Sequence, residues 1–600
     1  MATTYYVNNS GGNDTSTGTS QSTAWKTLAK VSGVSFSPGD SVLFNKGDVW
    51  RETLEIPSAG TLVNYITFGN YGTGINPRIL GSTATTTWTD QGGNIWKTDL
   101  TFIDPRSIYP NYEDIVFNTG GVERFGAYVA NVGALLAEYN WTWSANYIYI
   151  YAISNPGTRY TGVEVQQRRF GISTNNYEYL DFNGIDVFYC GDTGYDTNAD
   201  HGDNVNITNC IIENCEVGFI GGVTGQQYGY GIALCYSNLI VRHCTIHHCG
   251  RRSISINMLY TASPWTVKNI LVEDCIFHHG SHTTSIDITV NNGGDSASID
   301  GFIFRRNYVW EDPNDYNTST SRQIWLQRYG TTASVGIMTN FYIYNNIFKY
   351  TDSDVIGMEG QKGNFYIYNN TFYENISTGT SYGIYFDTDR GTCYVYIKNN
   401  IFYTTLNSDA GGRGAAIVML VPSSYYICNY NLFYRINNSL RVWFINGTSN
   451  YLNQISTVRS SYGWETNGST GNPLFNSTTD YHLQSTSPAR GMGIYLYDSS
   501  VLNTDYEGNI RNNPPSLGAY EYVRTTYYVT SAGSDSSDGL TQATAWQTLT
   551  KAQSTATTPG SIIALKKGDT WSLNNVLDVS HGGSAGNLII WDGSVWGNRI

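Results

Sequence analysis

The sequence predicts an all-β solenoid, a rod of stacked strand units, and three observations lead to this fold class. A phrase of alternating apolar and polar residues, closed by an Asn or Cys position and, two residues later, by an apolar residue such as Phe or Ile, returns about once every thirty residues. Its copies start near residues 205, 240, 271, 303, 342, 366, 396 and 426. Alternation with a period of two marks strands. A solenoid also lets 600 residues fold without one oversized core, because each coil contacts only its neighbours.

The chain divides into five predicted parts. They are an N-terminal β-helix cap module at 1–80, an irregular β elaboration at 81–170, regular parallel coils at 171–450, a closing segment at 451–523 and a truncated repeat of the cap module at 524–600. Each regular coil carries a second short strand after the phrase, for example at 383–386.

The cap module should cover the raw strand edge of the first rung. We expect a strand at 5–7, a short helix capped by Ser22 or Thr23, and a strand at 41–44. The same motifs return near the C-terminus, where residues 527–529 and 567–569 match 5–7 and 46–48. A second β-helix is therefore expected to begin at about residue 524.

Composition limits the function classes. The net charge is −14, which argues against nucleic acid as a partner, since phosphates demand a basic face. It also weighs against a polyanionic substrate unless a cation or a local basic patch intervenes. No run of eighteen apolar residues exists, so no membrane span is expected. The start of the chain has no signal-peptide pattern. We therefore expect a secreted, extracellular protein whose signal was removed, or a protein of a virion surface.

The nine cysteines are expected to be free and buried. Cys210, Cys244 and Cys275 fall in one column of the repeat, and Cys215 and Cys249 in another. Stacked strands lie about 4.7–4.9 Å apart, whereas a disulfide needs Cβ atoms roughly 3.5–4.5 Å apart. No CxxC pair suggests a zinc site.

The repeat resembles that of the right-handed parallel β-helix proteins of the pectate-lyase-like superfamily. The resemblance rests on the phrase, on 25–28, 38–40 and 47–51 near the start, and on 472–475 and 518–522 near the end. It implies a single-stranded right-handed parallel β-helix over nearly all of 1–523. The superfamily includes polysaccharide lyases, glycoside hydrolases, phage tailspikes and surface proteins, so the resemblance does not specify the chemistry. The polygalacturonase motifs of that superfamily are missing, and no convincing lyase pattern is present.

Stacking converts sequence columns into lines along the rod. The residue just after the inward apolar residue that closes each phrase should form one outward stripe, made of Glu213, His247, His278, Trp310, Lys349, Tyr373, Tyr403 and Tyr434. We interpret His247, His278, Trp310, Tyr373 and Tyr403 as candidate substrate-binding residues for an extended glycan. The alternative is a ladder that only stabilises packing between strands.

A second outward stripe follows the later strands. It includes Ser255, Asn257, Asp287, Thr289, Trp325, Gln327, Glu359, Tyr385 and Asp387. Glu359 and Asp387 occupy one column of adjacent coils, roughly 5 Å apart, which is close to the spacing of a retaining glycosidase pair. We predict them as catalytic, with Trp325 and Tyr385 binding substrate. Solvated acids at strand ends, or a calcium site, are the alternatives.

Seven of the nine histidines lie between 201 and 282. We add His282 and Asp287 as catalytic candidates and Arg252 as a substrate-binding residue. No metal site is predicted, because adjacent residues on a strand face opposite ways and the pairs at 247–248 and 278–279 should then diverge. Structural or surface histidines remain the alternative.

These residues favour a carbohydrate-active protein that binds and cleaves polysaccharide or cell-surface glycan, as a glycoside hydrolase sooner than a lyase. The alternatives are a non-catalytic glycan-binding tailspike or fibre module and a surface adhesin. No cofactor is expected apart from calcium as an alternative. A homotrimer is common among β-helix tailspikes, although no residue here indicates one.

Overall fold

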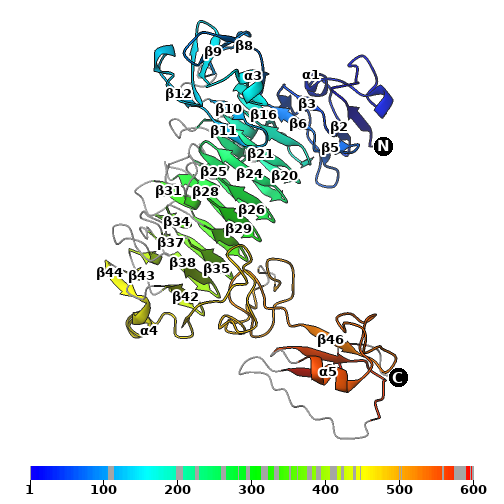
Figure 1. Cartoon of the computed structure of the whole chain (residues 1–600), viewed down its shortest axis with the longest axis vertical. Helices are drawn as coiled ribbons and strands as arrows, with labels where there is room; N and C mark the ends of the chain where they lie inside the picture. The colour runs from blue at the N-terminus through cyan, green and yellow to red at the C-terminus, as the bar shows by residue number, and fades with distance from the viewer. Residues whose placement is uncertain are drawn as a thin grey trace.

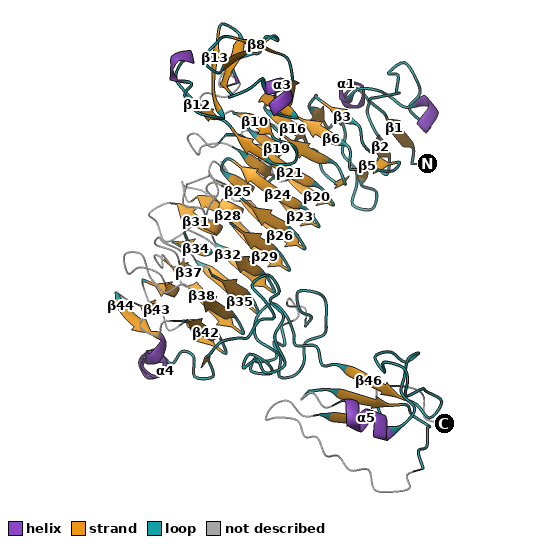
Figure 2. Cartoon of the chain, viewed as in Figure 1, coloured by secondary structure: helices purple, strands orange, loops and turns teal. Residues whose placement is uncertain are grey.

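The computed structural model of the chain is an elongated rod built almost entirely of strands (Figure 1, Figure 2). It describes residues 2–105, 114–197, 207–222, 229–258, 265–280, 283–291, 297–311, 322–329, 337–349, 353–360, 362–374, 382–386, 393–405, 415–420, 425–436, 441–445, 447–498, 501, 503–556, 560–572, 589–594 and 596.

Three twelve-stranded sheets run along the rod, and we call them sheets A, B and C. Sheet A contains β1 (Thr4–Val7), β2 (Ser41–Asn45), β5 (Ile66–Tyr71), β17 (Leu180–Asn183), β20 (Ile207–Glu213), β23 (Tyr236–Arg242), β26 (Trp265–Glu273), β29 (Ala297–Arg305), β32 (Met338–Tyr344), β35 (Gly363–Tyr368), β38 (Cys393–Lys398) and β41 (Tyr426–Asn429). Neighbouring strands pair parallel, as a solenoid requires.

Sheets B and C complete each coil. Sheet B contains β3 (Val49–Trp50), β6 (Arg78–Leu80), β18 (Asp186–Phe188), β21 (Glu216–Ile220), β24 (Thr245–Cys249), β27 (Ile276–His278), β30 (Tyr308–Trp310), β33 (Ile347–Lys349), β36 (Thr371–Tyr373), β39 (Ile401–Thr404), β42 (Leu432–Arg435) and β45 (Ser469–Thr470). Sheet C contains β4 (Leu54–Glu55), β16 (Phe170–Ser173), β19 (Thr193–Asp196), β22 (Tyr230–Ala233), β25 (Arg252–Met258), β28 (Thr283–Asn291), β31 (Arg322–Tyr329), β34 (Ile356–Glu359), β37 (Tyr382–Phe386), β40 (Ala415–Met419), β43 (Arg441–Ile445) and the antiparallel β44 (Thr448–Tyr451).

Each regular coil therefore has three strands, whereas the sequence predicted two. The repeated phrase spans a corner between sheets A and B, and its first Asn adopts a left-handed conformation there. Asn345, Asn369 and Asn399 have φ of 57°, 53° and 60°. Asparagine tolerates this region better than most residues. The corner divides each phrase into a strand of sheet A and a short strand of sheet B.

Side chains that point into the rod stack in register and form one continuous core. Sheet C contributes a column of isoleucines, all fully buried, at positions 254, 286, 324, 356, 384 and 417. Sheet B contributes stacked rings, with centroids 4.5 Å apart between Phe372 and Phe402 and 5.1 Å between Phe402 and Phe433. Full burial of such a side chain is worth about 1.5–3 kcal/mol.

A ladder of buried asparagines holds the corner between sheets A and B. The side-chain amide of Asn346 donates to Asn370 Oδ1 at 3.0 Å, Asn370 donates to Asn400 Oδ1 at 3.1 Å, and Asn400 donates to Asn431 Oδ1 at 3.0 Å. The predicted superposition of Asn346, Asn370 and Asn400 is confirmed. The last amide, of Asn431, donates to Glu465 Oε1 at 2.7 Å, so a carboxyl group ends the ladder.

Cysteines continue the same column toward the N-terminus. The backbone N–H of Cys275 donates to Asn307 Oδ1 at 2.9 Å, and the thiols of Cys215, Cys244 and Cys275 each bond the carbonyl two residues earlier. Both predicted cysteine columns are wrong. Cys210 pairs with residues 180 and 239 within sheet A, and Cys249 pairs with Ile220 in sheet B, whereas Cys215 shares the corner position of Cys244 and Cys275. All nine cysteines are free and buried, as expected.

The cap module covers the N-terminal end of the rod. Its helix α1 (Leu28–Ser32) begins later than predicted, because Thr27 is the N-cap and its side chain accepts a hydrogen bond from the Lys30 N–H. Ser22 and Thr23 instead lie in the short 3-10 helix η1 (Gln21–Thr23).

Two antiparallel-rich sheets form the elaboration that follows the cap (Figure 1). The first contains β11 (Glu123–Phe125), β10 (Ile115–Asn118), β15 (Gly162–Gln166) and β7 (Ser82–Thr85), and the second β12 (Ala127–Tyr128), β13 (Asn140–Ser144), β14 (Tyr147–Tyr151), β9 (Ile95–Thr98) and β8 (Trp88–Asp90). The helices η2 (Val132–Ala134) and α3 (Pro156–Arg159) lie between these strands. Val116 and Phe125 of the elaboration pack on Phe188 and Phe219 of sheet B, so this part covers the outer face of the first rungs.

The closing part contains η5 (Leu452–Gln454) and α4 (Ile455–Tyr462), and its later loops lie along the C-terminal rungs of the rod (Figure 1). Residues 524–600 contain β46 (Thr526–Val529), α5 (Leu549–Thr555), β47 (Ile562–Leu565) and β48 (Ile590–Asp592). They repeat details of the cap module. Tyr527 stacks on Trp546 at 4.8 Å as Tyr5 stacks on Trp25 at 4.9 Å. That these residues begin a second β-helix stays a prediction.

Candidate functional site

Sheet C carries five of the twelve predicted catalytic and binding residues, namely Arg252, Asp287, Trp325, Glu359 and Tyr385. Strand pairing places Asp287 beside Trp325, and Tyr385 two strands further in the same column. Glu359 lies in the neighbouring column, paired with Gln327. Because the isoleucines that alternate with them point into the core, these side chains point outward.

Asp287 is the centre of a buried polar network. Its carboxylate lies 3.0 Å from Nε of Arg252, accepts a hydrogen bond from Gln327 Nε2 at 2.7 Å and another from Thr289 Oγ1 at 2.8 Å. The Asp287 side chain is fully buried, and Arg252 is nearly so. Buried charges persist when they are paired and hydrogen-bonded in this way. Asp287 therefore organises the face and does not itself reach its surface.

Glu359 is a partly exposed carboxylate of this face. Its side chain is 32% exposed, and its Oε1 lies 3.0 Å from Nη2 of Arg322. The Nε of the same guanidinium lies 2.9 Å from Oδ2 of Asp354. Arg322 also stacks on Trp325, with its guanidinium carbon 4.0 Å from the ring centroid. One arginine thus holds two carboxyl groups and an indole together.

Asp354 was missed by the sequence analysis. It lies just before β34, outside the alternating run that indicated the other positions. Burial raises the pKa of Asp354 to about 6, and the nearby Glu359 charge adds to the rise while Arg322 opposes it. A carboxyl that titrates near neutral pH beside a second carboxyl is the arrangement that acid/base chemistry uses.

Two predicted catalytic residues, Asp387 and His282, lie outside the described residues. The predicted Glu359–Asp387 spacing therefore stays a prediction. Asp287 is two strands and two residues away from Glu359, about 11–12 Å between Cα atoms at ordinary strand spacing. These two carboxylates are thus too far apart for a retaining pair, whose carboxyls lie roughly 5–5.5 Å apart.

The predicted stripe on sheet B is in register from His247 onward. His247 pairs with His278, which pairs with Trp310, and the column continues through residues 349, 373, 403 and 434. Glu213 was wrongly included. It belongs to sheet A, and Gly218 takes its place beside His247.

The C-terminal half of this stripe is covered by the closing segment. Tyr373 is buried, and its ring lies 4.9 Å from that of Tyr481. The ring of Tyr403 lies 5.4 Å from that of Phe475. Both tyrosines therefore contribute to packing, and neither presents an open face to a glycan. His278 and Trp310, whose rings stack at 4.9 Å, remain half-buried.

The paired histidines do not diverge, and that expectation was wrong. Nδ1 of His247 lies 2.7 Å from Nδ1 of His248, and Nδ1 of His278 lies 2.5 Å from Nδ1 of His279. His248 and His279 have φ of 48° and 53°, which ends the strand alternation after the first histidine of each pair. Their side chains consequently turn toward the same side as those of His247 and His278.

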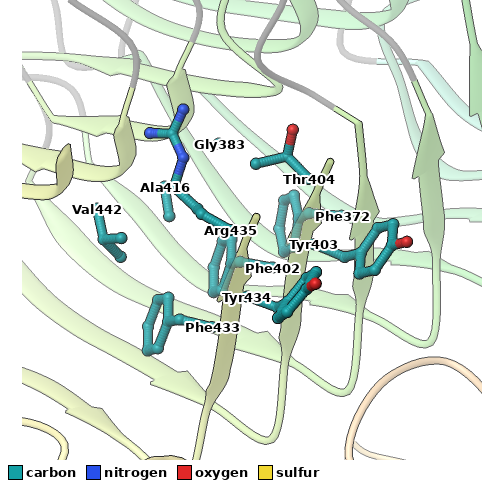
Figure 3. A pocket seen from close by; sticks show the side chains of 10 residues that line it. All are labelled: Phe372, Gly383, Phe402, Tyr403, Thr404, Ala416, Phe433, Tyr434, Arg435 and Val442. Carbon is teal, nitrogen blue, oxygen red and sulfur yellow. The ribbon is translucent and has the colours of Figure 1, made fainter. Parts of the chain in front are cut away.

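A small cavity lies between sheets B and C near the C-terminal rungs (Figure 3). It is left where Gly383, Ala416 and Val442 of sheet C face Phe402 and Phe433 of sheet B. None of its ten lining residues carries a carboxyl group. It is a gap in apolar packing, distinct from the acidic face of sheet C.

The three parallel sheets define the fold class of this chain, a right-handed parallel β-helix. No protein-family model matches it, and neither does any curated protein. In the described part of the chain no helix is long and apolar enough to cross a membrane.

Several solved structures are similar to this chain at low identity and with TM-scores below 0.5. A complex of XylC with xylose is 13% identical, with a TM-score of 0.48, and the match covers 87% of this chain and 98% of that one. Pectate lyase Pel9A is 12% identical, with a TM-score of 0.43 and coverage of 87% and 97%. A GH136 lacto-N-biosidase from Eubacterium ramulus is 14% identical, with a TM-score of 0.43; the match covers 74% of this chain and spans 65% of that chain. These likenesses concern the fold alone.

Proposed function

We propose that the protein binds an extended polysaccharide across the outward face of sheet C and cleaves it there as a glycoside hydrolase. The observation that carries this proposal is the group of Glu359, Arg322, Asp354 and Trp325. It combines an accessible carboxylate, a buried carboxyl with a raised pKa and an indole at one place on a β face.

In this proposal Glu359 is the catalytic residue that meets the glycosidic bond. A carboxyl can protonate the leaving oxygen or attack the sugar, and both roles require access to the substrate. Asp354 is a positioning residue that shares Arg322 with Glu359. Asp387 stays the sequence-predicted partner on the next coil. Trp325 is half-buried and stacks with Arg322, which also contacts Glu359, and the face of an indole suits the apolar face of a sugar ring.

Charge pairing on this face favours a hydrolase over a lyase. A lyase needs an unpaired cation to neutralise the uronate carboxylate of its substrate. Among the described residues of the face, Arg252 pairs with Asp287 and Arg322 with Asp354. Arg169, just before β16, pairs with Asp192 at 2.6 Å. A neutral glycan therefore suits this surface better than a polyuronate, in agreement with the net charge of −14.

Binding without cleavage is the second candidate function, as a tailspike, fibre or adhesin module. The observation that favours it is the fixed repetition of the rod, which presents equivalent positions at each coil to a repetitive polymer. Under either function we place the protein outside the cell or on a virion surface, where such polymers occur. The homotrimer and a calcium ion near Glu359 stay predictions.

A glycan panel tests the proposal directly. We expect incubation of the full chain with neutral and acidic polysaccharides to release new reducing ends from a neutral polymer. We expect no absorbance near 235 nm, roughly where unsaturated uronates absorb, because hydrolysis creates no double bond. Unsaturated products would identify a lyase. Tight binding without products would establish the second function, and neither binding nor products would refute both.

A further inference from the structure

We propose that His247, His248 and His278 form a binding site for a divalent transition-metal ion of the zinc type. The site lies on the outer face of sheet B, away from the carboxylates of sheet C. One ligand nitrogen from each of the three histidines lies within 4.8 Å of the other two. This inference is independent of the proposed glycan cleavage.

The backbone brings the imidazoles together. Parallel pairing of β24 and β27 places His247 directly beside His278, with rings 4.8 Å apart and nearly parallel. The left-handed residue His248 then turns its ring back toward His247, so that the two Nδ1 atoms meet at 2.7 Å. His279 repeats this turn one coil further and stacks on His248 at 4.6 Å. Four imidazoles from two coils therefore gather at one place.

A carboxylate orients one of the ligands. Oε1 of Glu216 lies 3.2 Å from Nε2 of His247. When Nε2 carries the proton and donates it to Glu216, the lone pair of Nδ1 is left facing His248. A carboxylate behind a histidine is the usual outer partner of a metal ligand, because it fixes the tautomer and raises the basicity of the ring.

Aromatic rings pack against the imidazoles and cover part of their surface from water. Phe219 stacks on His248 at 4.4 Å, and Trp310 stacks on His278 at 4.9 Å. The His247 ring is buried and the rings of His248 and His278 are half-buried, so the cluster is only partly open to water.

The chemistry of the donors selects the class of ion. Neutral imidazoles suit Zn²⁺, Cu²⁺ and Ni²⁺, whereas Ca²⁺ and Mg²⁺ take oxygen ligands. Zinc binds nitrogen at about 2.0–2.1 Å, so tetrahedral ligands lie roughly 3.3–3.4 Å apart. The ligand nitrogens of His247 and His248 lie 2.7 Å apart, and all three ligand nitrogens lie within 4.8 Å of one another, so small side-chain rotations would bring them to this spacing. Three protein ligands leave a fourth position open for water or a further ligand.

Zinc titration of the full chain tests the site. After treatment with EDTA and dialysis, calorimetry with ZnCl2 is expected to show one ion bound per chain. Cobalt in place of zinc should give the visible absorption of a tetrahedral nitrogen site. We expect His278→Phe, which keeps the stacked ring, and His248→Asn, which tolerates the left-handed backbone, to weaken zinc binding by about 100-fold. Glu216→Gln should weaken it by about 10-fold.

His243→Asn is the matched control. His243 lies in the same coil, is exposed and also has a left-handed backbone, with φ of 53°, so this variant should bind zinc like the unaltered chain. Circular dichroism of each variant checks its fold. The proposal is overturned if the unaltered chain binds no zinc, or if His278→Phe and His248→Asn bind it as tightly as His243→Asn does.

Discussion

Replacing Glu359 by Gln is expected to lower kcat on the cleaved glycan by about 10³-fold, with little change in KM. An amide has nearly the size of the carboxylate and can still accept the hydrogen bond of Arg322, so the fold and the binding face should survive. It cannot transfer a proton or attack a sugar, and general acid/base groups contribute roughly 10²–10⁴-fold. Initial rates of reducing-end release measure the effect.

Glu507→Gln is the matched control, because Glu507 is an exposed glutamate of the closing segment, outside the candidate site. The same assay on Asp387→Asn and His282→Gln tests the two sequence-predicted residues that lie outside the described part of the chain. Activity of Glu359→Gln within about threefold of the control would remove Glu359 from the mechanism.

Raising the pH from 5 to 8 is expected to destabilise the C-terminal end of the rod through Glu465. Burial raises the pKa of this carboxyl from 4.5 to about 8, although the hydrogen bonds from Asn431 oppose the rise. Between these values the folded chain holds a proton that the unfolded chain has lost. The free energy of unfolding is therefore highest below pH 4.5. It falls as the pH rises toward 8, by up to about 1.4 kcal/mol per pH unit.

Urea unfolding measured at several pH values, with tryptophan fluorescence, to which the adjacent buried Trp464 contributes, as the signal, checks this expectation. Glu465→Gln should be less dependent on pH over this range, because the amide does not titrate. Asp90→Asn on β8 serves as the control, since Asp90 is exposed and its replacement should leave the slope unchanged. Equal slopes for Glu465→Gln and the unaltered chain would show that Glu465 is ionised in the folded state.

The sequence was sufficient to predict the rod and much of its register. Fixed repetition places equal positions above one another, so the Asn ladder and the outward phase of Asp287, Trp325 and Glu359 followed from alternation alone. The corner inside each phrase was missed, because an Asn in the left-handed region interrupts a strand without any change in hydrophobic pattern.

Contacts between distant segments could not be predicted from a local pattern. Nothing near Tyr373 indicates that Tyr481, more than a hundred residues later, covers its ring. Asp354 lies outside the alternating run, and its pairing with Arg322 depends on how two coils stack. The prediction that the paired histidines diverge was wrong for a local reason. Neighbouring side chains alternate only in regular strands, and the backbone of His248 and His279 is left-handed.

The most direct test of the account is an experimental structure of Glu359→Gln bound to an oligosaccharide of the polymer that the panel identifies. The account predicts that the sugar chain lies across the outward face of sheet C, against Trp325, with one glycosidic oxygen within hydrogen-bond distance of residue 359. A sugar chain bound only on sheet B or on the elaboration, with the face around Trp325 empty, would contradict it.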